Sequence, residues 1–255
     1  MLTVGALFAG IGGIEFGLER TGYFETRWFV ENDGFCQKIL RKHWPRIPVY
    51  GDITTLDLAT LPKVDILTGG FPCQDISVAG TGKGIKEGTR SGLWFYFAKA
   101  IGILRPKYAL IENVPMLAKR GLDIVLANLA EAGYDAEWFD LRASDFGAPH
   151  RRERIFIVAG QPDLERRVIA DDWGERIQRF VQEKVSQKRG FSWCKDVRRV
   201  EDFMGRPNVP QPLFRGTRDG IPDWVDRIRA LGNAVVPDCA EFVGEMILEF
   251  DEGRK

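Results

Sequence analysis

The sequence is poor in the residue patterns that build disulfide frameworks and zinc sites. It has four cysteines, which are Cys36, Cys73, Cys194 and Cys239, and none of them belongs to a CxxC pair. Such spacing argues against both kinds of cross-link and is typical of a protein in a reducing compartment. We therefore expect no metal and a cytoplasmic location.

Long apolar runs are also lacking. The apolar beginning of the chain, residues 1–8, has no basic region before it, and Glu15 ends the run. No stretch of about 18 apolar residues offers a membrane span. The sequence therefore predicts neither a signal peptide nor a membrane partner.

Net charge is absent as well, with 36 Lys and Arg against 36 Asp and Glu. A neutral chain by itself predicts no nucleic-acid partner. Residues 150–219, however, carry 16 basic and 11 acidic residues, a net charge of +5. A basic segment beside an acidic remainder points to a polyanion, although charge alone favours a solvated surface.

What is present is an alternation of short apolar runs and amphipathic stretches. The expected strands are 2–8, 27–30, 49–50, 64–67, 108–111, 134–141 and 154–159. The expected helices are 14–22, 34–44, 93–104, 121–132 and 239–250. This order predicts an α/β fold with a doubly wound, mostly parallel sheet.

The alternation is lost after Gln161, where scattered aromatic residues, basic residues and prolines replace it. We expect one large domain, formed by residues 1–160 and 228–255, and a small domain with little regular structure at 161–227. The last helix is expected to pack back on the large domain.

Polar residues follow several of the expected strands. Glu31, Asp52, Cys73 and Glu112 each lie just past a strand end. Because right-handed crossovers bring such ends to one edge of the sheet, these side chains should converge. The sequence therefore predicts a single active cleft, with Cys73 as its candidate nucleophile.

A glycine-rich turn, residues 10–13, follows the first strand and lets a ligand approach the backbone closely. Glu31 lies 19 residues after Gly12, where an acidic residue ordinarily binds ribose hydroxyls. Glu15 occupies the last glycine position of the dinucleotide pattern GxGxxG, and its carboxylate repels a pyrophosphate. This combination favours a nucleoside cofactor without phosphates, such as S-adenosylmethionine, over NAD.

A second glycine-rich stretch, residues 79–92, fails the phosphate-loop pattern at Ser77 and Gly84. It is better interpreted as a mobile lid with glycine hinges, in which Lys83, Lys86 and Arg90 meet phosphates. A plain surface loop is the alternative.

Seven motifs occur in an order that resembles the DNA (cytosine-5)-methyltransferases of bacteria and phages. They are Phe8–Gly13, Glu31–Asn32, Gly51–Asp52, Gly70–Gln74, Glu112–Val114, Arg152–Arg154 and Gly232–Pro237. The resemblance covers about residues 3–160 and 199–250. The tetrapeptide of the amino-methylating DNA enzymes is absent.

The resemblance implies a covalent reaction at a cytosine ring. It gives Cys73 the role of a nucleophile at C6, which activates C5 for methylation. Glu112 would bind and protonate N3, which requires a raised pKa. Arg154 would donate to the ring O2, and Arg152 would support the site and a nearby phosphate.

The resemblance also implies the cofactor and DNA contacts. Phe8 would lie against adenine, Asp52 would contact its amino group, and Glu31 would hold the ribose. The full cofactor set is Phe8, Gly10, Gly12, Glu31, Asn32, Asp52, Ile53, Pro72, Asn233 and Ala234. The expected DNA contacts are Gln74, Ser77, Lys83 and Arg90.

The expected partner is double-stranded DNA, with the target base flipped out of the helix and the protein acting as a monomer in a bacterial cell or a phage-infected host. The 161–227 segment would be the target-recognition domain, and its short length suggests a short recognition sequence. His150 stands where the family usually has glutamine. The alternatives are a tRNA cytosine-5 methyltransferase, a catalytically silent DNA-binding protein, and an NAD oxidoreductase.

Overall fold

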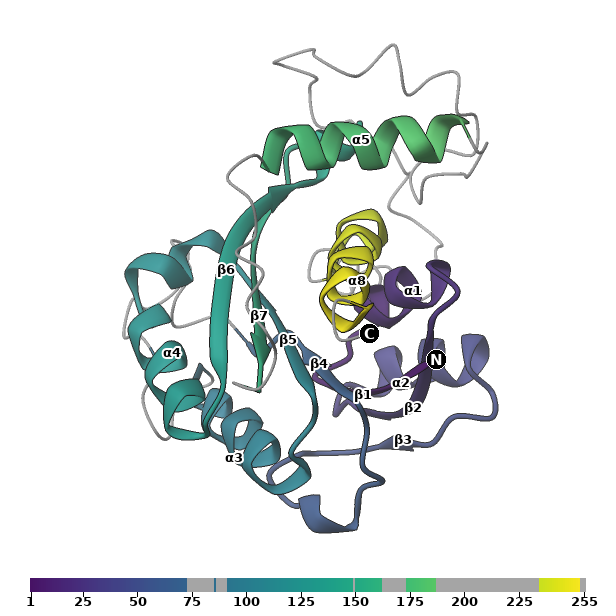
Figure 1. The fold of residues 1–255 in the computed structure, drawn as a ribbon. Helices are drawn as coiled ribbons and strands as arrows, with labels where there is room; N and C mark the ends of the chain where they lie inside the picture. Colours follow the sequence, from purple (N-terminus) through teal and green to yellow (C-terminus); the bar gives the residue numbers. More distant parts are fainter. Residues whose placement is uncertain (73–84, 86–90, 149, 162–172, 187–233, 253–255) are drawn as a thin grey trace, which may run out of the picture.

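A computed structural model of the chain describes residues 1–72, 85, 91–148, 150–161, 173–186 and 234–252. Its centre is a seven-stranded sheet with the order β3-β2-β1-β4-β5-β7-β6 (Figure 1). The strands are β1 (Leu2–Leu7), β2 (Phe24–Val30), β3 (Val49–Tyr50), β4 (Ile66–Gly69), β5 (Tyr108–Asn113), β6 (Asp135–Arg142) and β7 (Glu153–Gly160).

The five strands from β1 to β5 pair in parallel, whereas β7 runs antiparallel between β5 and β6. The sequence of strands along the sheet reverses between β1 and β4. In open α/β sheets, a crevice at such a reversal is where ligands bind. The predicted doubly wound, mostly parallel sheet is confirmed.

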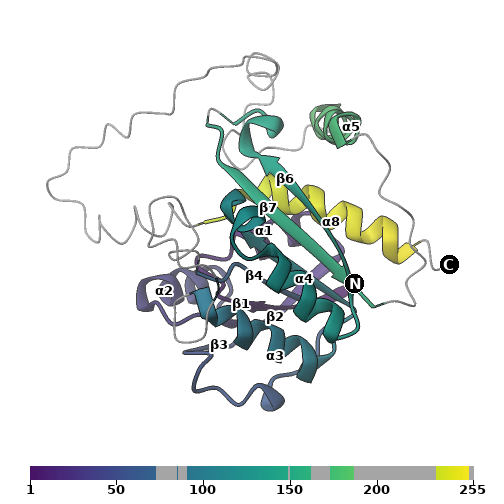
Figure 2. The ribbon, with the colours of Figure 1, turned by 90° about the vertical axis from the view of Figure 1, so that its left-hand side faces the viewer.

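Helices cover both faces of the sheet (Figures 1 and 2). The α-helices are α1 (Gly13–Arg20), α2 (Gly34–His43), α3 (Trp94–Leu104), α4 (Leu122–Glu131), α5 (Trp173–Ser186) and α8 (Pro237–Glu252). Four 3-10 turns are η1 (Leu58–Thr60), η2 (Ser91–Leu93), η3 (Pro115–Lys119) and η4 (Ala143–Phe146). One buried cluster joins α3 and α4 to the sheet, and another joins α1, α5 and α8 to its opposite face.

Close packing of α1 on α8 depends on a glycine. A Cβ placed on Gly17 would lie 2.3 Å from the carbonyl oxygen of Pro237 and 2.6 Å from the Cβ of Ala240. Only a residue without a side chain lets the two helices approach this closely. The C-terminal helix therefore packs on the large domain, as the sequence predicts.

Most expected elements are found with shifted ends. Strand β2 begins at Phe24 rather than Arg27, because Phe24 pairs with Leu2 of β1. Strand β4 begins at Ile66 rather than Val64. Just before it, the Asp65 carboxylate accepts bonds from the Thr3 amide and hydroxyl, at 2.8 and 2.7 Å.

Helix α5 lies within the segment 161–227, for which the sequence predicts little regular structure. Its apolar face is buried, with Phe180 against Phe146 of η4 and Phe242 of α8 at centroid distances of 5.8 and 5.4 Å. The described part of this segment thus contains a helix that packs on the large domain. The domain boundary itself stays a prediction.

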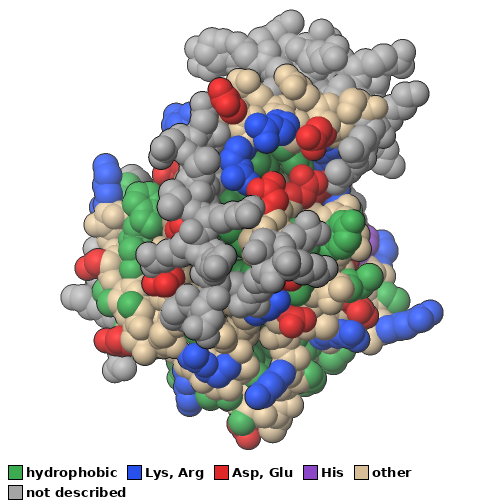
Figure 3. All heavy atoms as spheres, viewed as in Figure 1, with side chains coloured by type: hydrophobic (Ala, Val, Ile, Leu, Met, Phe, Trp, Pro, Cys, Tyr) green, Lys and Arg blue, Asp and Glu red, His purple; other side chains and the backbone are tan. Residues whose placement is uncertain are grey.

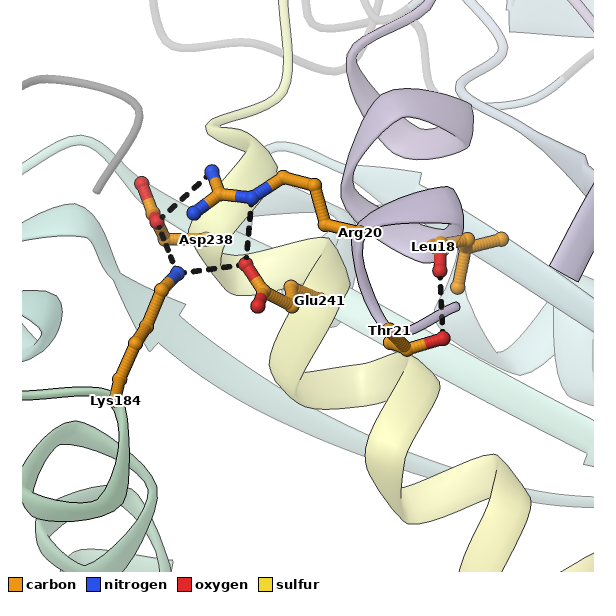
Figure 4. Close-up of polar contacts among 6 residues, drawn as sticks. All are labelled: Leu18, Arg20, Thr21, Lys184, Asp238 and Glu241. Carbon is orange, nitrogen blue, oxygen red and sulfur yellow. Dashed lines mark hydrogen bonds and ion pairs between the residues drawn. The ribbon is translucent and has the colours of Figure 1, made fainter. Parts of the chain in front are cut away.

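A buried cluster of charges fastens α5 to α8 and α1 (Figure 4). Lys184 of α5 has no exposed side-chain surface and lies 2.7 Å from the Asp238 carboxylate and 2.6 Å from that of Glu241. Arg20 of α1 pairs with the same two carboxylates, at 3.3 and 3.0 Å. The two cations and two anions compensate one another, which charged groups need away from water.

No helix among the described residues is long and apolar enough to cross a membrane.

Lys184→Met should lower the free energy of unfolding by about 3 kcal/mol, because it leaves two buried carboxylates with one cation. Chemical unfolding measures this loss. The matched control is Arg176→Ala, which removes an ion pair with the exposed Glu249 between the same two helices and should cost under about 1 kcal/mol. Equal losses from the two substitutions would contradict a structural role for the buried cluster.

Candidate functional site

A cavity of about 240 Å³ opens at the carboxyl ends of β1, β2, β4 and β5. It therefore lies at the reversal of strand order, as the convergence of strand-end residues predicts. Its lining residues are Phe8, Ala9, Gly10, Gly13, Ile14, Glu15, Glu31, Asn32, Asp33, Cys36, Gly69, Gly70, Phe71, Pro72, Glu112, Asn113, Val114, Arg154, Ala234 and Val235.

Glu31 organises the side of the cavity next to β2. Its Oε2 accepts a 2.7 Å bond from the Gly10 amide, and its Oε1 accepts a 2.8 Å bond from the Asp33 amide. The Asp33 side chain in turn caps α2 by accepting from the amides of Phe35 and Cys36. Burial raises the pKa of the Glu31 carboxyl, and these amide bonds oppose the rise.

The loop after β1 holds an unusual backbone. Phe8, which lines the cavity, has a φ of 52°, and Gly10 and Gly12 have φ values of 56° and 81°. Left-handed backbone is costly for a residue with a side chain and is found at functional sites. The Phe8 ring stacks on Phe97 of α3 with centroids 6.4 Å apart.

Glu112 and Arg154 form an ion pair on the β5 side of the cavity. The Arg154 Nε lies 2.9 Å from the Glu112 Oε1, and the Glu112 side chain is only 8% exposed. Burial raises the pKa of Glu112 to about 7, although Arg154 and Arg152 lower it. The site therefore holds a carboxyl group that can carry or release a proton near neutral pH.

Two neighbours hold Glu112 and the loop after β4 in place. A Cβ on Gly70 would lie 2.7 Å from the Glu112 Oε2, so that this position has no room for a side chain. The Asn113 side chain donates a 3.1 Å bond to the Phe71 carbonyl and accepts a 2.9 Å bond from the Val114 amide. Asn113 thus shapes the loop that leads to Pro72.

Arg152 joins β7 to the segment before α8. Its guanidinium donates to the carbonyl of Ala234, and its backbone has a φ of 32°. Arg152 is not among the lining residues. It fixes Ala234, which is one of them.

Glu15 is a buried carboxyl group in the first turn of α1. Its exposed fraction is 1%, and burial raises its pKa to about 7. The Thr68 hydroxyl of β4 donates a 2.5 Å bond to its Oε1, whereas its Oε2 has no hydrogen-bond partner in the described part of the chain.

The cavity brings together eight residues that the sequence predicts for the site. They are Phe8, Gly10, Glu31, Asn32, Pro72, Glu112, Arg154 and Ala234. Three other predicted residues do not line it. Gly12 packs against Trp44, and Ile53 is buried in the core. Asp52 is exposed, and its carboxylate accepts a hydrogen bond from the Thr54 amide. Cys73, Gln74, Ser77, Lys83, Arg90 and Asn233 lie outside the described residues.

Sequence reasoning missed several lining residues. Glu15 was considered only as a group that repels phosphate, and Asp33 and Cys36 were not considered for the site. A buried acid in an apolar helix turn is the signal that could have found Glu15. Asp33 and Cys36 carry no comparable signal, because a cap residue and a buried cysteine are ordinary structural features.

Charges of both signs are spread over the described surface of one face (Figure 3). Figure 3 shows acidic and basic side chains interspersed across the described part of one face, including the band between α5 and α8. Groups of three or more His, Cys, Asp and Glu that could hold a metal are not found among the residues described. The charged lining residues are four acids and one arginine, which suits an uncharged or cationic ligand better than a phosphate.

Fold and cavity together define an α/β protein with a partly acidic cavity at the carboxyl edge of its sheet. Residues 2–209 match the family model of the C-5 cytosine-specific DNA methylases. The match spans most of the chain, which therefore belongs to that family.

Two relatives illustrate how far the similarity extends. Type II methyltransferase M2.BsuMI of Bacillus subtilis (strain 168) is 37% identical over 231 residues, which are 86% of this chain and 58% of the relative. Type II methyltransferase M.NgoBI of Neisseria gonorrhoeae is 40% identical over 159 residues, 60% of this chain and 48% of that protein. The chain thus spans about half the length of the relatives it matches.

Solved structures agree on the fold. A DNA modification methyltransferase encoded within a prophage, from E. coli, superposes with a TM-score of 0.54 at 28% identity, over 65% of this chain and 48% of that one. The S. pombe Dnmt2 methyltransferase gives a TM-score of 0.56 at 20% identity, over 74% and 56%. The second likeness concerns the fold alone.

We predict that Glu112 titrates near pH 7 in the ligand-free protein and that Arg154→Met raises its pKa further, because the arginine stabilises the charged form. Carbon NMR of labelled glutamate carboxyls measures both values, and Glu112→Gln assigns the signal. Arg151→Met is the control, since Arg151 is 67% exposed and pairs with Glu153. A Glu112 pKa near 4.5, the value of a free glutamate, would contradict the prediction.

Proposed function

We propose that this protein transfers a methyl group from S-adenosylmethionine to C5 of cytosine in double-stranded DNA. The observation that carries the proposal is the buried Glu112–Arg154 pair, which shares one cavity with Glu31 and with Pro72, the residue before Cys73. Family membership supports the same reaction.

The lining residues fit S-adenosylmethionine. This cofactor has ribose hydroxyls, a sulfonium and an ammonium, and no phosphate, which suits a lining with four acids and one arginine. Phe8, Gly10, Glu31 and Asn32 would hold its nucleoside part beside β1 and β2. When bound, the cofactor supplies an electrophilic methyl group.

The nucleophile proposed for this reaction is the Cys73 thiolate. Its sulfur would form a bond to C6 of the cytosine, and the electron pair of the C5–C6 double bond would move to C5. C5 could then take the methyl group as the bond from that methyl to the cofactor sulfur breaks, which leaves S-adenosylhomocysteine. A base or water would take the C5 proton, the C5–C6 double bond would form again, and the C6–S bond would break, which regenerates the Cys73 thiolate.

Glu112 makes the ring ready for that addition. A carboxyl with a pKa of about 7 can donate its proton to N3, which withdraws electrons from C6. Arg154 uses part of its guanidinium on Glu112 and on the Glu153 carbonyl. A guanidinium has five donors, so Arg154 can also donate to the ring O2.

The reaction requires a base that has left the double helix, because a stacked cytosine cannot reach the cavity. We propose that residues 79–92 act as a lid over the flipped base and that Gln74, Ser77, Lys83 and Arg90 contact DNA. We further propose a monomer with a recognition domain at 161–227, acting in the cytoplasm where bacterial DNA lies.

Cys73→Ala should abolish methyl transfer to DNA, because it removes the proposed nucleophile. The measurement is incorporation of labelled methyl groups from S-adenosylmethionine into plasmid DNA. Cys239→Ala is the control, since this buried cysteine packs among apolar residues and burial raises its pKa well above the usual value, so that its thiol is inert. Methyl transfer that survived Cys73→Ala would refute the covalent mechanism.

The same assay with tRNA in place of DNA tests the RNA alternative, for which transfer to tRNA alone would be the result. Base-resolution mapping of the methylated plasmid then gives the recognition sequence. We expect fewer than about six fixed bases, since each base needs its own contacts and the proposed reader is short.

A further inference from the structure

The Glu15 carboxyl is the one acidic lining group of the cavity that has a buried oxygen without a hydrogen-bond partner among the described residues. Glu31 binds two backbone amides, Asp33 caps α2, and Glu112 pairs with Arg154. The Oε2 of Glu15, by contrast, is buried without a hydrogen-bond partner among the described residues. A buried oxygen of this kind is costly unless a ligand completes its bonding.

The groups around Glu15 favour a cation as its ligand. The described residues give it a bond from the Thr68 hydroxyl and one from its own backbone amide, and the charged neighbour that acts on it among them is Glu19 of its own helix, which is also acidic. Burial raises its pKa to about 7, as expected for a carboxyl with no positive partner. A cationic ligand would supply the missing compensation.

The sheet order places Glu15 between the two ends of the proposed reaction. Glu31 follows β2, whereas Glu15 is bonded to Thr68 on β4, and β1 lies between these strands. Glu112 ends β5, one strand further on. A cofactor with its nucleoside beside β2 and its reacting methyl near the β5 side would have its sulfonium between these strands, and the amino-acid chain that branches from the sulfonium could then reach Glu15.

We propose that the Glu15 carboxylate binds the ammonium group of the amino-acid part of S-adenosylmethionine and so positions the cofactor in the cavity. The inference rests on the proposed function, because it takes the cofactor from it. The Thr68 hydroxyl binds Oε1, which leaves Oε2 as the oxygen for the ligand. The first-turn amides of α1, which have no side-chain cap, offer donors for the carboxylate of the same amino acid.

A comparison of three ligands distinguishes the contribution of the ammonium group to binding from that of the rest of the cofactor. The first is S-adenosylmethionine itself. S-adenosylhomocysteine keeps the ammonium and lacks the sulfonium charge, and methylthioadenosine keeps the nucleoside and lacks the whole amino-acid part. Calorimetric titration of each ligand into the wild-type protein and into Glu15→Gln, without DNA, gives the affinities. Glutamine keeps the shape of glutamate and removes the charge.

Glu15→Gln should weaken binding of S-adenosylmethionine and of S-adenosylhomocysteine by a similar factor, about 10- to 100-fold, as expected for a lost charge-assisted hydrogen bond. Binding of methylthioadenosine should be unchanged. A loss confined to S-adenosylmethionine would assign Glu15 to the sulfonium, and an equal loss for all three ligands would assign it to the fold. Either result overturns the inference.

Two further measurements keep the outcome clear. Thr68→Val retains the Glu15 charge and removes the group that orients it, so it should weaken the same two ligands by a smaller factor. Thermal unfolding of both variants checks that each is folded at the titration temperature. A wild-type protein that bound none of the three ligands would overturn the proposed function as well, whereas wild-type binding with unselective variant effects overturns only the role of Glu15.

Discussion

The reversal of strand order between β1 and β4 is the constraint on which the rest of the structure depends. Chain segments leave these two strands toward opposite faces of the sheet, so that their carboxyl ends cannot be covered by one crossover. The opening that remains is the cavity, and its walls are the turns that follow β1, β2, β4 and β5. Glu112 and Arg154 lie on the paired strands β5 and β7, which are rigid, whereas Glu31 is held by the amides of Gly10 and Asp33.

The cavity is lined by buried acidic side chains. Glu15, Glu31 and Glu112 are all nearly inaccessible to water, and burial raises the pKa of each. They differ in how they are compensated. Glu31 has backbone amides and Glu112 has an arginine, whereas Glu15 has the Thr68 hydroxyl and its own amide and, in the described part of the chain, no positive neighbour that acts on it. A cavity whose acids differ in this way can hold a proton at one point and bind a cation at another.

The close approach of α1 to α8 and the buried ion cluster of Lys184 hold the elements next to the cavity together. Gly17 lets α8 pack on α1, and the segment before α8 brings Ala234 to the cavity, where Arg152 binds its carbonyl. Lys184 adds α5 to the same assembly through Asp238 and Glu241 at the start of α8. Helix α5 of the proposed recognition segment is thus joined directly to the helix that follows the lining residues Ala234 and Val235.

The sequence by itself determined the alternation of strands and helices and the set of polar residues at strand ends, because period and turn residues are local properties. Glu31 and Glu112 could be selected in this way, whereas Arg154 was selected by the resemblance to a family. Only the tertiary structure decided that β7 runs antiparallel beside β5, which brings Arg154 to Glu112. It also decided the helical form of α5 and the position of Glu15, since both depend on packing between segments far apart in the chain, and no local pattern encodes such contacts.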